Sequence, residues 1–169
     1  MSGSINSTNV LITGSQIGTL AHPFRTGVHL ASGSQFTIES SSIIAFSPGP
    51  VTTGINIDDS GTALTLNNST ISVSGAVGTP VGSNRGIDTN NATAATVTIN
   101  TSNITVGTNA ETVEQVGIFN VVSASAITMN GGTLAIAGTA PGPQLFTSGA
   151  PVTLNAVTCI LNGTTVVCP

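Results

Sequence analysis

Residues 54–75 read GINIDDSGTALTLNNSTISVSG, and residues 86–107 read GIDTNNATAATVTINTSNITVG. Both stretches begin with Gly-Ile, continue into an alternating apolar block with threonine at its centre, and reach a second apolar pair before a closing glycine. Apolar residues that alternate with a period of two, many of them β-branched, predict short half-buried strands rather than helices. A unit that returns in register along the chain predicts a solenoid, in which each copy stacks on the next.

The alternating block occurs six times in the chain. The blocks are Val10–Ile12, Phe36–Ile38, Leu64–Leu66, Val97–Ile99, Ile127–Met129 and Val152–Leu154. Five residues after the end of each block stands a second apolar residue or a cysteine: Ile17, Ile43, Ile71, Ile104, Leu134 and Cys159. The distance from one block to the next is too long for a single hairpin and too short for a βαβ unit, so each copy is interpreted as one coil.

A third strand is predicted before four of the blocks, and we expect it to begin at a glycine. These glycines are Gly27, Gly54, Gly86 and Gly117, and each would serve a corner that needs a positive φ or a close backbone approach. Gly149 stands only four residues before Thr153, so we expect the third strand to be lost from the last coil. Pro- and Gly-rich loops are expected at 47–50, 76–84 and 139–143.

The sequence therefore predicts an all-β parallel β-helix of about six coils with three short strands per coil. It forms a single domain over residues 1–169, with coils at about 9–160 and a C-terminal hairpin or cap at about 157–169. The pattern Gly-Ile-x-Ile…Thr-x-Leu-x-Asn-Ser-Thr-Ile-x-Val-x-Gly resembles the right-handed parallel β-helix of bacterial autotransporter passengers and related secreted adhesins, over about residues 9 to 160. The resemblance implies an extracellular or cell-surface protein, although pectate-lyase-like enzymes and phage tailspikes share this architecture.

Charged residues are scarce. Arg25 and Arg85 are the only strong cations, lysine is absent, and two cations against six acids give a net charge of −4. Binding of nucleic acid needs a cationic footprint that neutralises phosphates, so no nucleic-acid partner is expected. No apolar run approaches the roughly 18 residues of a transmembrane span, so no membrane insertion is expected.

The two cysteines, Cys159 and Cys168, flank the dipeptide Asn162-Gly163. Asn-Gly favours a type I′ hairpin turn, which would bring the two cysteines together. The sequence thus predicts a disulfide that clamps the last coil and implies an oxidising compartment. The alternative is two buried thiols, because Cys159 occupies a column otherwise held by isoleucine and leucine.

Stacking the coils places polar residues in two outward columns. Neighbouring residues within each column lie about 4.8 Å apart. The first is a threonine column of Thr37, Thr65, Thr98, Thr128 and Thr153, and the second is an asparagine column of Asn67, Asn100, Asn130 and Asn155. Such columns arise for structural reasons, because stacked threonine and asparagine side chains hydrogen-bond along a solenoid. They also form a regular uncharged surface, and these nine residues are the predicted binding site, for a glycan or for ice.

An enzymatic interpretation depends on the few ionisable groups. Asp58-Asp59 and Asp88 follow equivalent Gly-Ile strands one coil apart, and together with His29 and Arg85 they could converge. A glycosidase or lyase needs paired carboxylates or carboxylates with a base and a cation. The alternative is turn-forming aspartate at a corner, which is the interpretation we favour. We predict no catalytic residues, no metal site and no cofactor.

The predicted function is that of a non-enzymatic extracellular or cell-surface β-solenoid, similar to an adhesin or passenger. Its expected partners are a surface glycan or protein, or further copies of itself, end to end or laterally. Three alternatives remain open at the level of the sequence: a filament subunit that stacks end to end, an ice-binding protein that uses the threonine column, and a polysaccharide-degrading enzyme.

Overall fold

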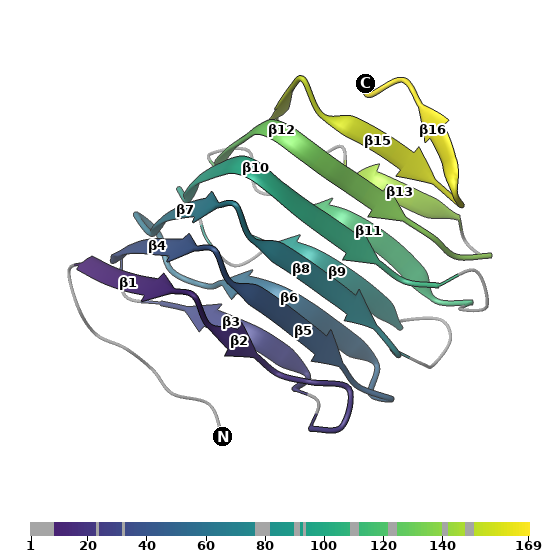
Figure 1. Ribbon diagram of the computed structural model, residues 1–169, viewed down its shortest axis with the longest axis horizontal. Coiled ribbons are helices and arrows are strands. Elements are labelled where there is room, and N and C mark those ends of the chain that lie inside the picture. Colours follow the sequence, from purple (N-terminus) through teal and green to yellow (C-terminus); the bar gives the residue numbers. More distant parts are fainter. Residues whose placement is uncertain are drawn as a thin grey trace.

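A computed structural model describes residues 9–22, 24–31, 33–76, 82–89, 92, 94–108, 112–121, 125–139, 142–147 and 151–169. The chain is an all-β parallel β-solenoid of about five turns with two parallel sheets, sheet A and sheet B. Sheet A lies in front of sheet B in Figure 1, and the coils follow one another from the N-terminal to the C-terminal end. Among the described residues there is no helix long and apolar enough to cross a membrane.

Sheet A contains both apolar blocks of every coil. Its strands are β1 (Asn9–Thr13), β2 (Gln16–Ile17), β4 (Gln35–Glu39), β5 (Ser42–Phe46), β7 (Ala63–Asn67), β8 (Thr70–Ser74), β10 (Thr96–Val106), β12 (Ala126–Ile136), β14 (Val152–Asn155), β15 (Thr158–Leu161) and β16 (Thr164–Val166). In β10 and β12 the two blocks form one continuous strand instead of the two expected strands. The prediction of three strands per coil therefore holds for the coils that contain β4–β5, β7–β8 and β14–β15 but not for these two.

A corner lies between the two blocks of each coil. At least one residue per coil takes a positive φ there: Gly14, Ser40, Asn68, Thr101, Gly131 with Gly132, and Ala156. Because the chain turns at this residue while the flanking strands keep their pairing, sheet A bends along a line through all coils. The bend divides the outer surface of the sheet into two strips.

Serine follows the corner residue in the first four coils and forms a buried column of hydrogen bonds. The hydroxyl of Ser69 donates to the carbonyl of Asn67 at 2.7 Å and accepts the backbone N–H of Ser41 at 3.1 Å. The hydroxyl of Ser102 repeats this pattern with Asn100 and Ser69. Each hydroxyl thus satisfies a backbone donor of the preceding coil, which a corner would otherwise leave unpaired.

Sheet B contains the strands that carry the glycines. They are β3 (Thr26–Leu30), β6 (Val51–Ile57), β9 (Ser83–Asp88) and β11 (Glu114–Phe119); the fifth strand of the sheet, β13 (Pro143–Phe146), has no glycine. The glycines lie inside these strands, not at their start, and none of them has a positive φ. Close approach explains them: a Cβ on Gly86 would meet the carbonyl oxygen of Gly117 at 2.4 Å and Cγ2 of Ile104 in sheet A at 2.6 Å.

The prediction that the last coil lacks its third strand is wrong. Strand β13 pairs in parallel with β11 and places Leu145 level with Gly117. The strand was missed because its sequence has no glycine at this position, and Gly149 lies outside the described residues. The expected loops at 76–84 and 139–143 lie partly outside the described residues too, and their ends at Ser83 and Pro143 already belong to strands.

The core fills the space between the two sheets. It consists of the inward members of the alternating blocks, such as Ile38, Leu66 and Ile99, together with Ile55 and Ile87 of sheet B, all without exposed surface. Six copies of the first block stack in sheet A, whereas sheet B has five strands. Six blocks therefore bound about five turns, which corrects the expected number of about six coils.

Candidate functional site

The predicted threonine column exists on the outer surface of sheet A. The strand register stacks Leu11, Thr37, Thr65, Thr98, Thr128 and Thr153 in this order, one residue per coil. The first four threonines are half-buried and Thr153 is exposed. Leu11 breaks the column at the N-terminal end, where its side chain is 63% exposed.

The predicted asparagine column is a hydrogen-bonded ladder. Asn100 Nδ2 donates to Asn67 Oδ1, Asn130 Nδ2 to Asn100 Oδ1, and Asn155 Nδ2 to Asn130 Oδ1, each at 2.9 Å. All donors point toward the N-terminal coils, so the amide dipoles are aligned. Glu39 stands next in the column, level with Asn67, and its negative charge lies at the donor end of the ladder, where it is favourable.

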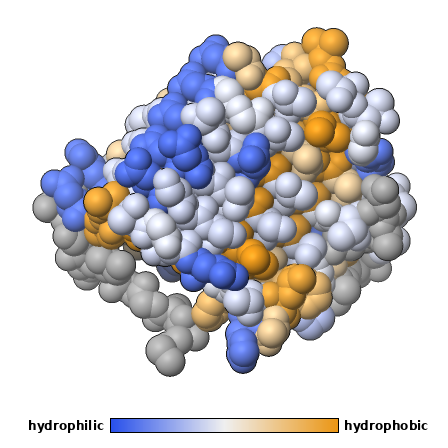
Figure 2. All heavy atoms as spheres, in the orientation of Figure 1, coloured by the Kyte–Doolittle hydropathy of each residue, from blue (hydrophilic) through white to orange (hydrophobic). Residues whose placement is uncertain are grey.

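These two columns lie side by side because Thr98 and Asn100, for example, are two residues apart on one strand and point to the same face. We call the nine residues Thr37, Thr65, Thr98, Thr128, Thr153, Asn67, Asn100, Asn130 and Asn155 the Thr–Asn strip. Figure 2 shows hydrophilic residues gathering on the side of sheet A where β4 and β7 lie, and hydrophobic residues on the side of β5. The strip carries no charge of its own.

The geometry leaves the strip with unused hydrogen-bonding capacity. An asparagine amide has two N–H donors and an oxygen with two lone pairs. The ladder uses one donor and one lone pair of each interior asparagine, and the second set remains for solvent or a ligand. The threonine hydroxyls beside them add one donor and acceptor per coil, so the strip offers the same polar groups again at every turn of the solenoid.

The ionisable residues considered for catalysis lie on the outer surface of sheet B. His29, Asn56, Asp88 and Phe119 are level with one another on successive strands. His29 Nε2 is bonded to Asp58 Oδ2, and Asp58 Oδ1 accepts a hydrogen bond from Asn56 at 2.9 Å. Of the residues considered from the sequence, the structure thus brings His29, Asp58 and Asp88 to one surface of the sheet.

Arg85 and Asp88 form an ion pair on the same surface. Arg85 Nη1 lies 2.7 Å from Asp88 Oδ2, and the guanidinium carbon stacks 3.6 Å from the centre of the Phe119 ring. The Asp88 side chain is 9% exposed and that of Arg85 is 19% exposed, so the pair is mostly shielded from water. Each of the carboxylates of Asp58 and Asp88 is held by a basic side chain, while Asp59 lies exposed in the following turn.

In the described part of the chain, no group of three or more His, Cys, Asp or Glu side chains is placed to hold a metal ion. The two cysteines occupy a different position, at the C-terminal end of sheet A.

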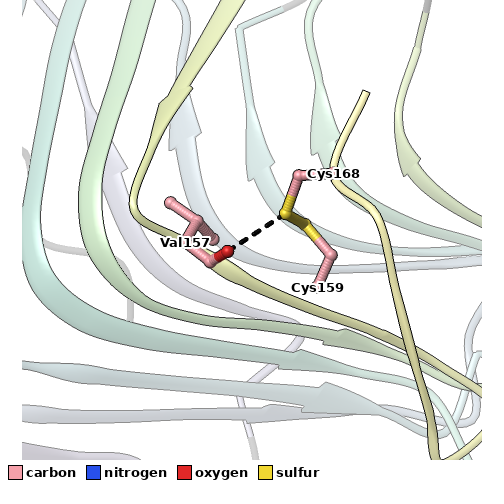
Figure 3. The surroundings of a disulfide bond; sticks show 3 residues. All are labelled: Val157, Cys159 and Cys168. Carbon is pink, nitrogen blue, oxygen red and sulfur yellow. Dashed lines mark hydrogen bonds between the residues drawn. A yellow bond between two sulfur atoms is a disulfide. The ribbon is translucent and has the colours of Figure 1, made fainter.

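Cys159 and Cys168 form the predicted disulfide, with their Cα atoms 5.5 Å apart (Figure 3). Asn162 and Gly163 both have a positive φ, as a type I′ turn requires. Cys168 Sγ lies 3.2 Å from the carbonyl oxygen of Val157, and Figure 3 marks this contact with a dashed line. A disulfide sulfur carries no proton, so this is a close sulfur–oxygen contact and not a donated hydrogen bond.

The buried serine column was not predicted from the sequence. Its signal is present: serine occurs at the third position after the block in four coils, as Ser15, Ser41, Ser69 and Ser102. In a chain rich in serine this recurrence acquires meaning only when the corner is known.

Comparison with known proteins gives no match to a family model, to a curated protein or to a solved structure.

Proposed function

We propose that this chain is a non-enzymatic extracellular or cell-surface solenoid of the adhesin or passenger type, which binds an uncharged surface glycan along the Thr–Asn strip. One observation carries the proposal: threonine and asparagine repeat in register over successive coils, and the asparagine amides are locked in one orientation by the ladder. A ligand that repeats along its length can use the same contact at every coil.

Hydrogen bonding accounts for recognition in this proposal. The second amide donor of each interior asparagine and the neighbouring threonine hydroxyl can pair with the hydroxyl groups of a sugar. Because the ladder already fixes the amides, little side-chain freedom is lost on binding. Each contact is weak, but contacts along one polymer add up through their high effective concentration. The disulfide supports an oxidising compartment, in agreement with an extracellular location.

The test is binding of the purified chain to an array of immobilised neutral and acidic glycans. Thr98→Lys places a long charged side chain in the middle of the strip, and we expect it to weaken binding by about tenfold or more, about 1.4 kcal/mol. The matched control is Gln144→Lys, which adds the same charge at an exposed position of β13 in sheet B. Equal binding by wild type and both variants would contradict the proposed site, and failure to bind any glycan would contradict the proposed ligand.

Ice binding is the second candidate, favoured by the uninterrupted threonine column of five coils. Each threonine presents a methyl group and a hydroxyl at a constant repeat on a rigid sheet, which is a regular match for a solid lattice. Thermal hysteresis of the wild type, abolished in Thr98→Lys, would support ice binding in place of glycan binding. A freezing point equal to the melting point at high protein concentration would exclude it.

The polysaccharide-degrading alternative has less support. A glycosidase needs one carboxyl group as acid and another as base or nucleophile at the scissile bond. Here the Asp58 carboxylate is hydrogen-bonded to His29 and the Asp88 carboxylate is paired with Arg85, so both carboxylates already have a partner. Detectable glycan cleavage that Asp88→Ala removes would revive this alternative.

A further inference from the structure

The C-terminal hairpin covers an edge that would otherwise continue the solenoid. Strand β15 pairs in parallel with β12 on one side and with β16, in the antiparallel direction, on the other. Figure 1 shows β16 at the position where the next coil of sheet A would lie. Among the described residues, β14 pairs with β12 on one side and with no strand on its other side. The edge therefore stays open at β14, and β16 covers it only at β15.

The first coil offers an edge that matches the last one. Strands β1 and β2 pair with β4 and β5 on one side, and no described strand pairs with their other side. The inward residues Ile12 and Ile17 have the same five-residue offset as Leu154 and Cys159. A second copy placed on the last coil would therefore continue the same register that joins coil to coil within the chain.

Apolar surface at both ends favours this contact. Val10, Ile12 and Ile17 at one end, and Val152 and Leu154 at the other, pack against the core but are only partly buried. Burying such surface is favourable in water. A net charge of −4 offers little repulsion between copies.

The disulfide holds the blocking strand in place. Strand β16 has three paired residues, and Thr164 and Thr165 are exposed. The turn before it is anchored separately, because Asn162 Oδ1 accepts from Gly138 N–H at 2.9 Å. Cys168 is therefore the point that fixes the far end of β16 over β15. Cys159 is buried, whereas Cys168 is half-buried, so Cys168 is the sulfur within reach of a thiol.

We propose that the disulfide-locked β16 is a redox-controlled cap over a head-to-tail interface between copies of this chain. A dithiol reductant attacks Cys168 Sγ, the S–S bond breaks, and Cys159 leaves as a thiolate that takes up a proton. The second thiol of the reductant then closes its own disulfide and releases the thiol of Cys168. With β16 released, β15 accepts β2 of a second copy and β14 accepts its β1.

The experiment measures the mass of the purified chain by sedimentation velocity over a range of protein concentrations, with and without dithiothreitol, and follows the β-sheet signal by circular dichroism. We expect a monomer when oxidised and a mass that grows with concentration when reduced, at an unchanged β-sheet signal. The variant Cys159→Ala/Cys168→Ala should associate without reductant. The proposal would be overturned if the reduced wild type and the folded double variant both remained monomeric. It would also be overturned if the oxidised wild type associated as strongly as the reduced wild type.

A second variant tests the site of contact. The carbonyl of Ser15 accepts the N–H of Ser42 at 2.8 Å, so Ser15 and Ile17 face β5 and Gln16 directs its N–H to the open edge. Gln16→Pro removes only this outward donor, and we expect it to abolish association of the reduced chain. Gln16→Ala, the matched control, should associate like wild type. Association of Gln16→Pro that equals that of Gln16→Ala would show that the copies do not meet at β2.

Discussion

At the residue scale, Ser102 is the position where stability depends most clearly on a single hydroxyl group. It has no exposed surface. Its hydroxyl donates to Asn100 at 2.9 Å and accepts the N–H of Ser69 at 3.0 Å. We predict that Ser102→Ala lowers the free energy of unfolding by about 1–3 kcal/mol, because it leaves the buried N–H of Ser69 without a partner. Urea denaturation followed by circular dichroism measures this difference.

The control for this prediction is Ser72→Ala, which removes a hydroxyl from an exposed position of β8. We expect it to change the free energy of unfolding by less than about 0.5 kcal/mol. Equal effects of the two substitutions would mean that the serine column does not stabilise the corner.

At the element scale, the approach of β9 to β11 and to sheet A depends on Gly86. A Cβ at this position would meet a backbone oxygen of the next coil at 2.4 Å, and that oxygen cannot move without disturbing β11. We predict that Gly86→Ala destabilises the chain by about 3 kcal/mol or more, because overpacking forces the strands apart. The measurement is the urea midpoint and slope.

Gly61→Ala provides the comparison, because a Cβ there meets nothing within 4 Å although φ is +74°. Its expected cost is the smaller cost of a left-handed alanine, about 1–2 kcal/mol. If Gly86→Ala were no more destabilising than Gly61→Ala, the result would contradict the explanation that Gly86 is needed for the close approach of the strands.

The elements also show how much of the fold could be predicted from the sequence. Period-two alternation predicted the blocks and their register, because a strand in a solenoid must place its apolar residues inward. It could not tell whether Gly86 provides a positive φ or a close approach, because both require glycine. It missed β13, where Leu145 stands in place of the glycine, and it divided β10 in two, because the five-residue offset from Ile99 to Ile104 interrupts the period-two alternation although the strand continues through Thr101.

The stacking of the candidate residues could be predicted from the sequence, whereas a binding role for them stays a prediction. The threonine and asparagine columns follow from the repeat, because residues at equal offsets must stack. The disulfide follows from the turn at Asn162-Gly163. The pairing of His29 with Asp58 could not be foreseen, because it depends on how the chain leaves β6, where Asp58 is no longer within the strand.

At the scale of the whole molecule, the solenoid spreads one small set of polar groups over many coils and places the charged pairs on the opposite sheet. The proposed binding along the Thr–Asn strip would therefore use several coils at once, unlike a pocket formed at a single point of the chain. Because none of the nine residues of the strip is charged, recognition in this proposal would rest on hydrogen bonds and shape.

Binding along the Thr–Asn strip is tested by the affinity of three variants for one glycan: Thr65→Lys, Thr98→Lys and Thr128→Lys, each measured by titration calorimetry beside wild type. We expect all three to weaken binding by about tenfold or more, because each interrupts the same periodic contact on a different coil. Loss of binding in only one variant would indicate a local pocket, and unchanged affinity in all three would contradict binding by the Thr–Asn strip.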